Sequence, residues 1–91
     1  MNTVIDNTEK SRFELKENGK LAIADYTLRD GVMTILHVEA DPALRGTGAA
    51  ARLMEGVLAE IRAHDLKVRP VCSYAVAYLK KHPEQQDLRV Q

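Results

Sequence analysis

The chain has 91 residues, 45% of them apolar, which is enough for one small domain with a hydrophobic core. Thirteen basic and thirteen acidic residues cancel, which argues against the charged surface of a protein that binds nucleic acid or anionic membranes. No apolar run approaches the roughly 18 residues of a membrane span, and the N-terminus lacks the basic and apolar parts of a signal peptide. A single cysteine excludes an internal disulfide and suits a reducing compartment, so we expect a cytoplasmic protein.

The first half of the chain predicts a tail followed by antiparallel strands. Residues 1–10 are mostly polar, and we expect them to form a loose tail before a single domain over residues 11–91. Alternating or continuous apolar residues then predict three strands, separated by dipeptides that are typical of two-residue hairpin turns. The strands are expected near 12–16, 21–28 and 32–38, with turns at Asn18-Gly19 and Asp30-Gly31.

Two tight turns also predict the register of these strands. If neither hairpin contains a bulge, Leu15 of the first strand lies opposite Ala22 of the second. In the second hairpin, His37 of the third strand then lies opposite Ala24, and Glu39 lies opposite Ala22. The small alanines would then leave room for a ligand beside His37. A bulge in the third strand would shift this register by one residue and exchange the faces beyond it.

A glycine-rich turn follows the third strand. Pro42 ends the strand, because proline cannot donate to a ladder. Residues 45–50, Arg-Gly-Thr-Gly-Ala-Ala, then lead into a segment ending at Ala63 whose apolar residues recur at helical spacing. Unpaired amides and the helix dipole at such a junction favour an anion, and glycines at 46 and 48 let it approach the backbone. A simple connection between strand and helix is the alternative.

The remaining residues predict one more strand and one more helix. Residues 66–72 form the strand, parallel to the third because a helix separates the two. Ser73 can cap a helix over 74–82, which Pro83 ends, and the tail from Glu84 is mostly polar. The predicted fold is therefore α/β, with a mostly antiparallel sheet whose last two strands are parallel around a central helix.

Two residues are candidates for catalysis. Cys72 immediately precedes the last predicted helix, whose N-terminus would stabilise the nucleophilic thiolate. A buried structural cysteine is the alternative. His37, near the end of the third strand, could take a proton from Cys72 or from an attacking amine, or could simply pack. Glu39 is a rival base. Histidine and cysteine are too scattered for a metal site, so we expect no metal.

The motifs resemble one superfamily. Arg-x-x-Gly-x-Ala at 45, 48 and 50 resembles the pyrophosphate-binding signature of the GNAT acyl-CoA N-acyltransferases. Residues 68–74, with His82-Pro83-Glu84, look like the C-terminal segment of a minimal GNAT family that has a cysteine at this point, proposed as catalytic. The resemblance spans Phe13 to Leu88. The usual aromatic residue after His-Pro-Glu is replaced by Gln85.

The resemblance implies acetyl-CoA as cosubstrate and an amine as acceptor. The pantetheine arm would pair with backbone near Val38. Lys80 or Lys81 could meet the ribose phosphate, or could simply form a solvated helix end. The residues implied at the pyrophosphate are Arg45, Gly46, Thr47, Gly48, Ala49 and Ala50. Transfer could be direct or pass through acetyl-Cys72. The acceptor is not identified by the sequence, and a CoA-binding module or sensor with little or no turnover is the alternative function.

Overall fold

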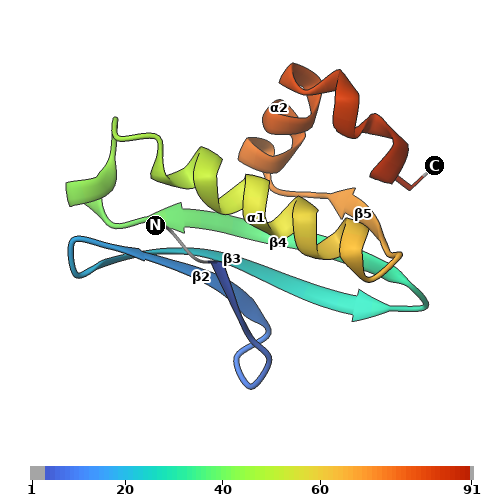
Figure 1. Cartoon of the computed structure of the whole chain (residues 1–91), viewed down its shortest axis with the longest axis horizontal. Helices are drawn as coiled ribbons and strands as arrows, with labels where there is room; N and C mark the ends of the chain where they lie inside the picture. Colours follow the sequence, from blue (N-terminus) through green and yellow to red (C-terminus); the bar gives the residue numbers. More distant parts are fainter. Residues whose placement is uncertain (1–3, 91) are drawn as a thin grey trace.

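The computed structural model describes residues 4–90, which form one five-stranded sheet with helices packed against it (Figure 1). The strands are β1 (Val4–Asn7), β2 (Arg12–Glu17), β3 (Lys20–Arg29), β4 (Val32–Ala40) and β5 (Lys67–Pro70). The helices are α1 (Ala49–Ala63) and α2 (Ser73–Lys81), with short 3-10 helices η1 (Pro42–Leu44) and η2 (Pro83–Leu88). The strands lie in sequence order, and neighbours are antiparallel except for parallel β4 and β5. The predicted fold is confirmed.

Both hairpin turns have the predicted geometry. Asn18 and Gly19 have φ of 51° and 73°, and Asp30 and Gly31 have φ of 51° and 77°. Positive φ at both central residues matches the right-handed twist of the flanking strands and fixes the register. The predicted pairing of Leu15 with Ala22 is accordingly observed.

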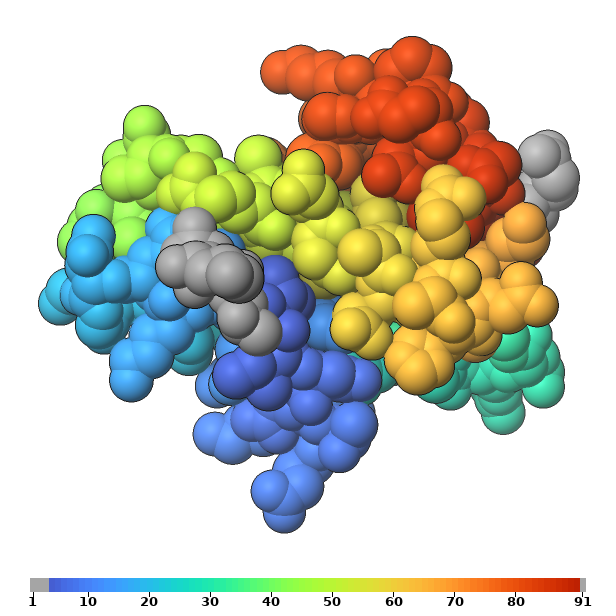
Figure 2. Space-filling model, in the orientation of Figure 1, coloured from blue at the N-terminus to red at the C-terminus, as the bar shows by residue number. Residues whose placement is uncertain are grey.

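The core lies between the sheet and α1. The apolar face of α1 is fully buried, and its members are Leu53, Met54, Val57, Leu58 and Ile61. They pack with the inward-facing strand residues, among them Phe13, Leu15 and Ile35. Figure 2 shows α1, in yellow, lying between the blue N-terminal strands and the red C-terminal segment.

Residues 4–7 do not form the predicted tail. They pair with β2 as an edge strand, and Tyr26 donates a hydrogen bond from its hydroxyl to Oδ1 of Asp6 over 2.6 Å. Val4 packs where Gly56 of α1 has no side chain, since a Cβ on Gly56 would be 2.3 Å from Val4 Cγ2. The tail prediction is therefore wrong for residues 4–7, and residues 1–3 lie outside the described chain.

The C-terminal end also differs from the prediction. Strand β5 ends at Pro70, and α2 has Cys72, not Ser73, as its N-cap residue. The segment expected to be a polar tail forms η2 instead. Its Leu88 is only 4% exposed and belongs to the hydrophobic core. Val90 then donates its amide hydrogen to the carbonyl oxygen of Val68 over 2.9 Å. None of the helices in residues 4–90 is long and apolar enough to cross a membrane.

Candidate functional site

A bulge in β4 determines which of its side chains face the core. Tyr26 of β3 pairs with Ile35, whereas Asp25 pairs with His37. Leu36 is therefore an extra residue in β4. One extra residue moves every following side chain to the opposite face of the sheet. The bulge is the alternative that the sequence left open.

Because of the bulge, His37 has neighbours other than the predicted ones. Ala24 lies opposite Val38 rather than His37, and Ala22 lies opposite Ala40 rather than Glu39. Both predicted pairs are therefore wrong, and they do not form the expected ligand space beside the imidazole. His37 instead lies on the outer face of the sheet with Glu39, and its Nε2 is 3.0 Å from Oε1 of that carboxylate. Their side chains are 55% and 66% exposed, so both are accessible to a molecule approaching from solvent.

The backbone of β4 has an open edge after the bulge. The amide of Asp41 donates to the carbonyl oxygen of Leu21 in β3 over 3.0 Å. Because backbone groups of successive strand residues point to opposite edges, the N–H and C=O groups of Val38 and Ala40 point away from β3. An extended ligand could pair with this edge as an added strand would.

Strand β5 ends before it covers that edge. Its last pair joins Ile35 to Pro70, which has no amide hydrogen. The amides of Val71 and Cys72 then both donate to the carbonyl oxygen of Ile35, each over 3.1 Å. After this point the chain turns into α2, so β4 and the C-terminal segment separate.

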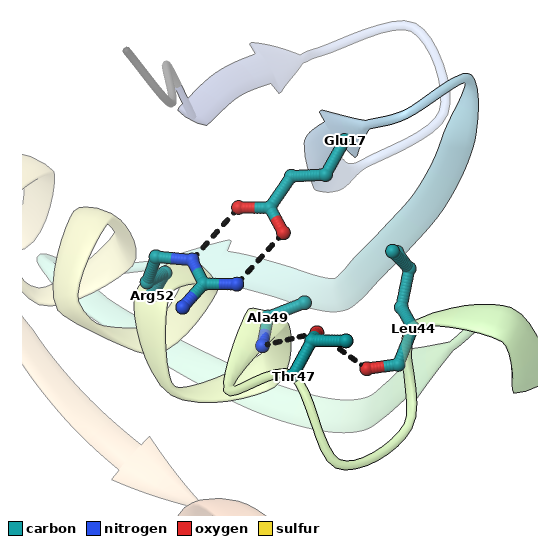
Figure 3. Close-up of polar contacts among 5 residues, drawn as sticks. All are labelled: Glu17, Leu44, Thr47, Ala49 and Arg52. Carbon is teal, nitrogen blue, oxygen red and sulfur yellow. Dashed lines mark hydrogen bonds and ion pairs between the residues drawn. The ribbon is translucent and has the colours of Figure 1, made fainter.

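The turn before α1 presents free amides. Gly46 and Gly48 have φ of 80° and 84°, a left-handed conformation that glycine adopts at no steric cost. Thr47 stabilises the turn, because its hydroxyl donates to Leu44 carbonyl oxygen over 2.6 Å and accepts from the Ala49 amide over 3.3 Å (Figure 3). Among the described residues, no protein acceptor is paired with the amides of Gly46, Gly48, Ala50 and Ala51. Together with the dipole of a 15-residue helix, they favour an anion.

Arg52 lies beside this turn and is held by Glu17 at the end of β2. Its Nε and Nη2 donate to the two carboxylate oxygens of Glu17 over 2.7 and 2.8 Å (Figure 3). This hydrogen bonding keeps the pKa of Glu17 below its ordinary value. The third guanidinium nitrogen, Nη1, is 3.0 Å from the position that a Cβ on Gly48 would occupy. A cationic group is thus fixed next to the free amides.

Two hollows extend from the turn toward α2. The first, of about 280 Å³, is lined by Ala40 at the open edge, by the turn, and by Tyr74. The second, of about 180 Å³, shares Ala51 and Tyr74 with the first and continues to Tyr78 and Lys81. Burial raises the pKa of the phenol of Tyr78. The two hollows form a path from the edge of β4, past the free amides, to an aromatic and cationic end.

The two predicted catalytic residues lie on different sides of β4. Cys72 is the N-cap residue of α2 and packs, half-buried, against the hydrophobic core. His37 is on the outer face and contacts Glu39. Both residues lie near the open edge, but among the described residues no hydrogen bond joins the thiol to the imidazole. In the described part of the chain, no three histidine, cysteine or carboxylate side chains are grouped as metal ligands would be.

Sequence reasoning missed several residues of this site. Ala51 belongs to the first helical turn, one residue beyond the motif. Arg52 is four residues after Gly48 and hence on the same helix face, a signal that spacing alone could have supplied. Its partner Glu17 is 35 residues away, so the ion pair depends on the tertiary fold. Tyr74 and Tyr78 share a face of α2 in the same way, with ring centroids 6.4 Å apart.

The chain is similar to known proteins in sequence and in fold. The model of a family described as GCN5-related N-acetyl-transferase matches residues 12–88. A solution structure of a GCN5-like protein from Staphylococcus aureus, described as a proposed N-acetyltransferase, covers 96% of this chain and 86% of its own. The TM-score is 0.69 and the sequence identity 24%, so this likeness concerns the fold. No curated protein matches the chain significantly.

Proposed function

The chain belongs to the GCN5-related N-acetyltransferase family, and we propose that it binds acetyl-CoA and transfers the acetyl group to an amine. One observation carries the proposal: the hollow that begins at Ala40, on the open edge of β4, also reaches the free amides of the turn. A single extended ligand with a diphosphate group could therefore occupy both. Acetyl-CoA has this form.

The proposed path of the cosubstrate follows these groups in order. The diphosphate lies in the turn from Arg45 to Ala50, where the amides of Gly46, Gly48 and Ala50 donate to it. Thr47 and Ala49 support the turn through their internal hydrogen bonds. The amide groups of pantetheine pair with the backbone of Val38 and Ala40. The nucleotide then enters the second hollow, which Lys81 lines and Lys80 does not.

The acetyl thioester would lie at the edge of β4, between the core side and the outer face. An amine nitrogen attacks the carbonyl carbon, the C–S bond breaks, and CoA leaves as a thiolate. The attacking amine must lose a proton, which a base can accept. On the outer face, His37 and Glu39 are exposed to solvent and so accessible to an incoming amine. We propose His37 as this base, with Glu39 orienting its ring.

The second route uses Cys72 on the core side. Its sulfur would attack the thioester, release CoA and form an acetyl-thioester that the amine then cleaves. The N-cap position supports this route, since a helix N-terminus stabilises a thiolate. Among the described residues, no hydrogen bond joins the thiol of Cys72 to the imidazole of His37, and this favours direct attack.

A CoA-binding module without turnover remains the second candidate. The observation that favours it is the exposure of His37 and Glu39, which are more than half exposed, so residues 4–90 do not enclose an acceptor around them. Such a protein would bind CoA thioesters through the same edge and turn but release little CoA in the presence of amines.

One set of measurements separates these functions. Purified protein is titrated with acetyl-CoA in a calorimeter, and release of CoA is followed with small primary amines, polyamines and lysine peptides. Intact mass after incubation with acetyl-CoA reports an acetyl adduct. The variants are Cys72→Ala, His37→Ala and, as a matched control, His64→Ala, whose exposed imidazole also lies 3.1 Å from a carboxylate, that of Glu60.

We expect binding, amine-dependent CoA release, loss of release in His37→Ala, and wild-type behaviour in His64→Ala. Release retained in Cys72→Ala identifies direct transfer. An adduct present in wild type and absent in Cys72→Ala identifies the covalent route. Binding without release under any of these amines supports the CoA-binding module. A folded protein that does not bind acetyl-CoA contradicts the whole proposal.

A further inference from the structure

We propose that Arg52, held in place by Glu17, is the side chain that contacts the diphosphate of CoA. The inference depends on the proposed function, since it concerns the same turn. The sequence motif instead assigns this role to Arg45. The contacts of the two arginines distinguish them.

Arg52 has one guanidinium nitrogen left for a ligand. Nε and Nη2 are both hydrogen-bonded to Glu17. Nη1 has no acceptor among the described residues, and it lies beside Gly48, whose own amide is one of the free donors of the turn. A phosphate oxygen bound by these amides would therefore lie close to a fixed cationic donor.

Arg45 has no such arrangement. Arg45 lines the first hollow, which Arg52 does not, but its side chain is exposed and makes no hydrogen bond or ion pair within the described chain. Its amide donates to the carbonyl oxygen of Pro42. Fixing a free arginine on a ligand loses side-chain conformational entropy. Glu17, whose side chain is only 10% exposed, has already ordered Arg52 in the folded protein. A donor that is already oriented binds with a smaller entropic loss.

The pairing with Glu17 also predicts which substitutions are tolerated. The planar guanidinium can donate to Glu17 with two nitrogens and to a phosphate with the third. The ammonium of a lysine at this position is a single point and cannot serve both partners in that geometry. Because Glu17 offsets much of the charge of Arg52, the contact acts through a directed hydrogen bond more than through long-range attraction.

The experiment compares Arg52→Gln and Arg52→Lys with Arg62→Gln. Arg62 is a matched control, because it lies on the same helix and also donates two hydrogen bonds to one carboxylate, that of Asp87, over 2.8 and 3.0 Å. Ten residues of helix place it about 15 Å away along the axis of α1. Each variant is titrated with CoA and with acetyl-pantetheine, which has no diphosphate. Thermal unfolding confirms that each is folded.

We expect Arg52→Gln to weaken CoA binding about tenfold, the low end for hydrogen bonds to charged groups, and to leave acetyl-pantetheine binding unchanged. Arg52→Lys should weaken CoA binding as well, and it replaces Arg52→Gln if that variant does not fold. Arg62→Gln should bind both ligands as wild type does. Equal CoA affinity in the Arg52 variants and Arg62→Gln, or equal loss for both ligands, would overturn the inference. Wild-type protein that does not bind CoA would overturn the proposed function with it.

Discussion

Replacing single glycines by alanine separates the stability of the turn from its use as a binding site. Gly31, Gly46 and Gly48 have φ of 77°, 80° and 84°, so an alanine at any of them is held in the left-handed region. That conformation costs a residue with a Cβ about 1–2 kcal/mol. Gly31 lies in a hairpin outside the candidate site and serves as the control.

The space around each glycine determines how much stability and CoA binding the alanine loses beyond this backbone cost. Nothing lies within 4 Å of a Cβ at Gly31 or Gly46, so only the backbone term applies there. A Cβ at Gly48 would be 3.0 Å from Nη1 of Arg52. Nη1 belongs to a guanidinium that Glu17 orders, so the group has to shift by a few tenths of an ångström, and the additional loss of stability should be small if the ion pair persists. The loss of binding should be larger, since the free nitrogen of Arg52 is displaced from the turn.

Urea unfolding and calorimetric titration with CoA test both parts. All three variants should lose about 1–2 kcal/mol of unfolding free energy, and each kcal/mol lowers Tm by about 4–8 °C in a domain of this size. Only Gly46→Ala and Gly48→Ala should bind CoA more weakly, and Gly48→Ala should lose about tenfold. Wild-type CoA affinity in folded Gly48→Ala would remove the turn from the site. Undiminished stability in Gly31→Ala would refute the conformational argument.

Two further predictions concern the parts of the fold around the site. Gly56→Ala should lower the unfolding free energy by about 1–3 kcal/mol, as overpacking does, because its Cβ would be 2.3 Å from Val4 Cγ2. Adding Val4→Ala to the same chain should restore part of this loss in urea unfolding. If nothing is restored, β1 does not pack against α1 at this point. The lowered pKa of Glu17, caused mainly by its hydrogen bonds to Arg52, means that the ion pair stabilises the fold above the ordinary pKa of 4.5 and that this stability is lost as the pH falls. Urea unfolding of Glu17→Gln between neutral and acidic pH should therefore show a weaker dependence on pH than wild type, and an identical dependence would contradict the ion pair.

Local patterns in the sequence were sufficient for most of the fold. The helical period predicted α1, and positive φ at Asn18-Gly19 fixed the register of β2 against β3, because both depend on residues close in the chain. The glycine turn was found for the same reason. Strand β1 was missed, since a short polar segment becomes a strand only when Val4 fits against Gly56 of α1.

The missed features of the C-terminal end and of the site depend on contacts between distant segments. Leu88 is buried under residues that precede it by many positions, so η2 could not be distinguished from a polar tail. The pair Glu17–Arg52 joins the end of β2 to the start of α1. Neither residue carries a local signal for the other. The sequence therefore predicted where the turn lies but not which charged side chain accompanies it.

The bulge at Leu36 connects the two halves of the proposed site. Without it, His37 would lie opposite Ala24, on the core side, and the backbone groups of Val38 would point toward β3. With it, the imidazole lies on the outer face and the N–H and C=O groups of Val38 point to the open edge. One inserted residue thus exposes a candidate base to the acceptor and a backbone strip to the cosubstrate. Both effects follow from the period of two in a strand, so neither can change without the other.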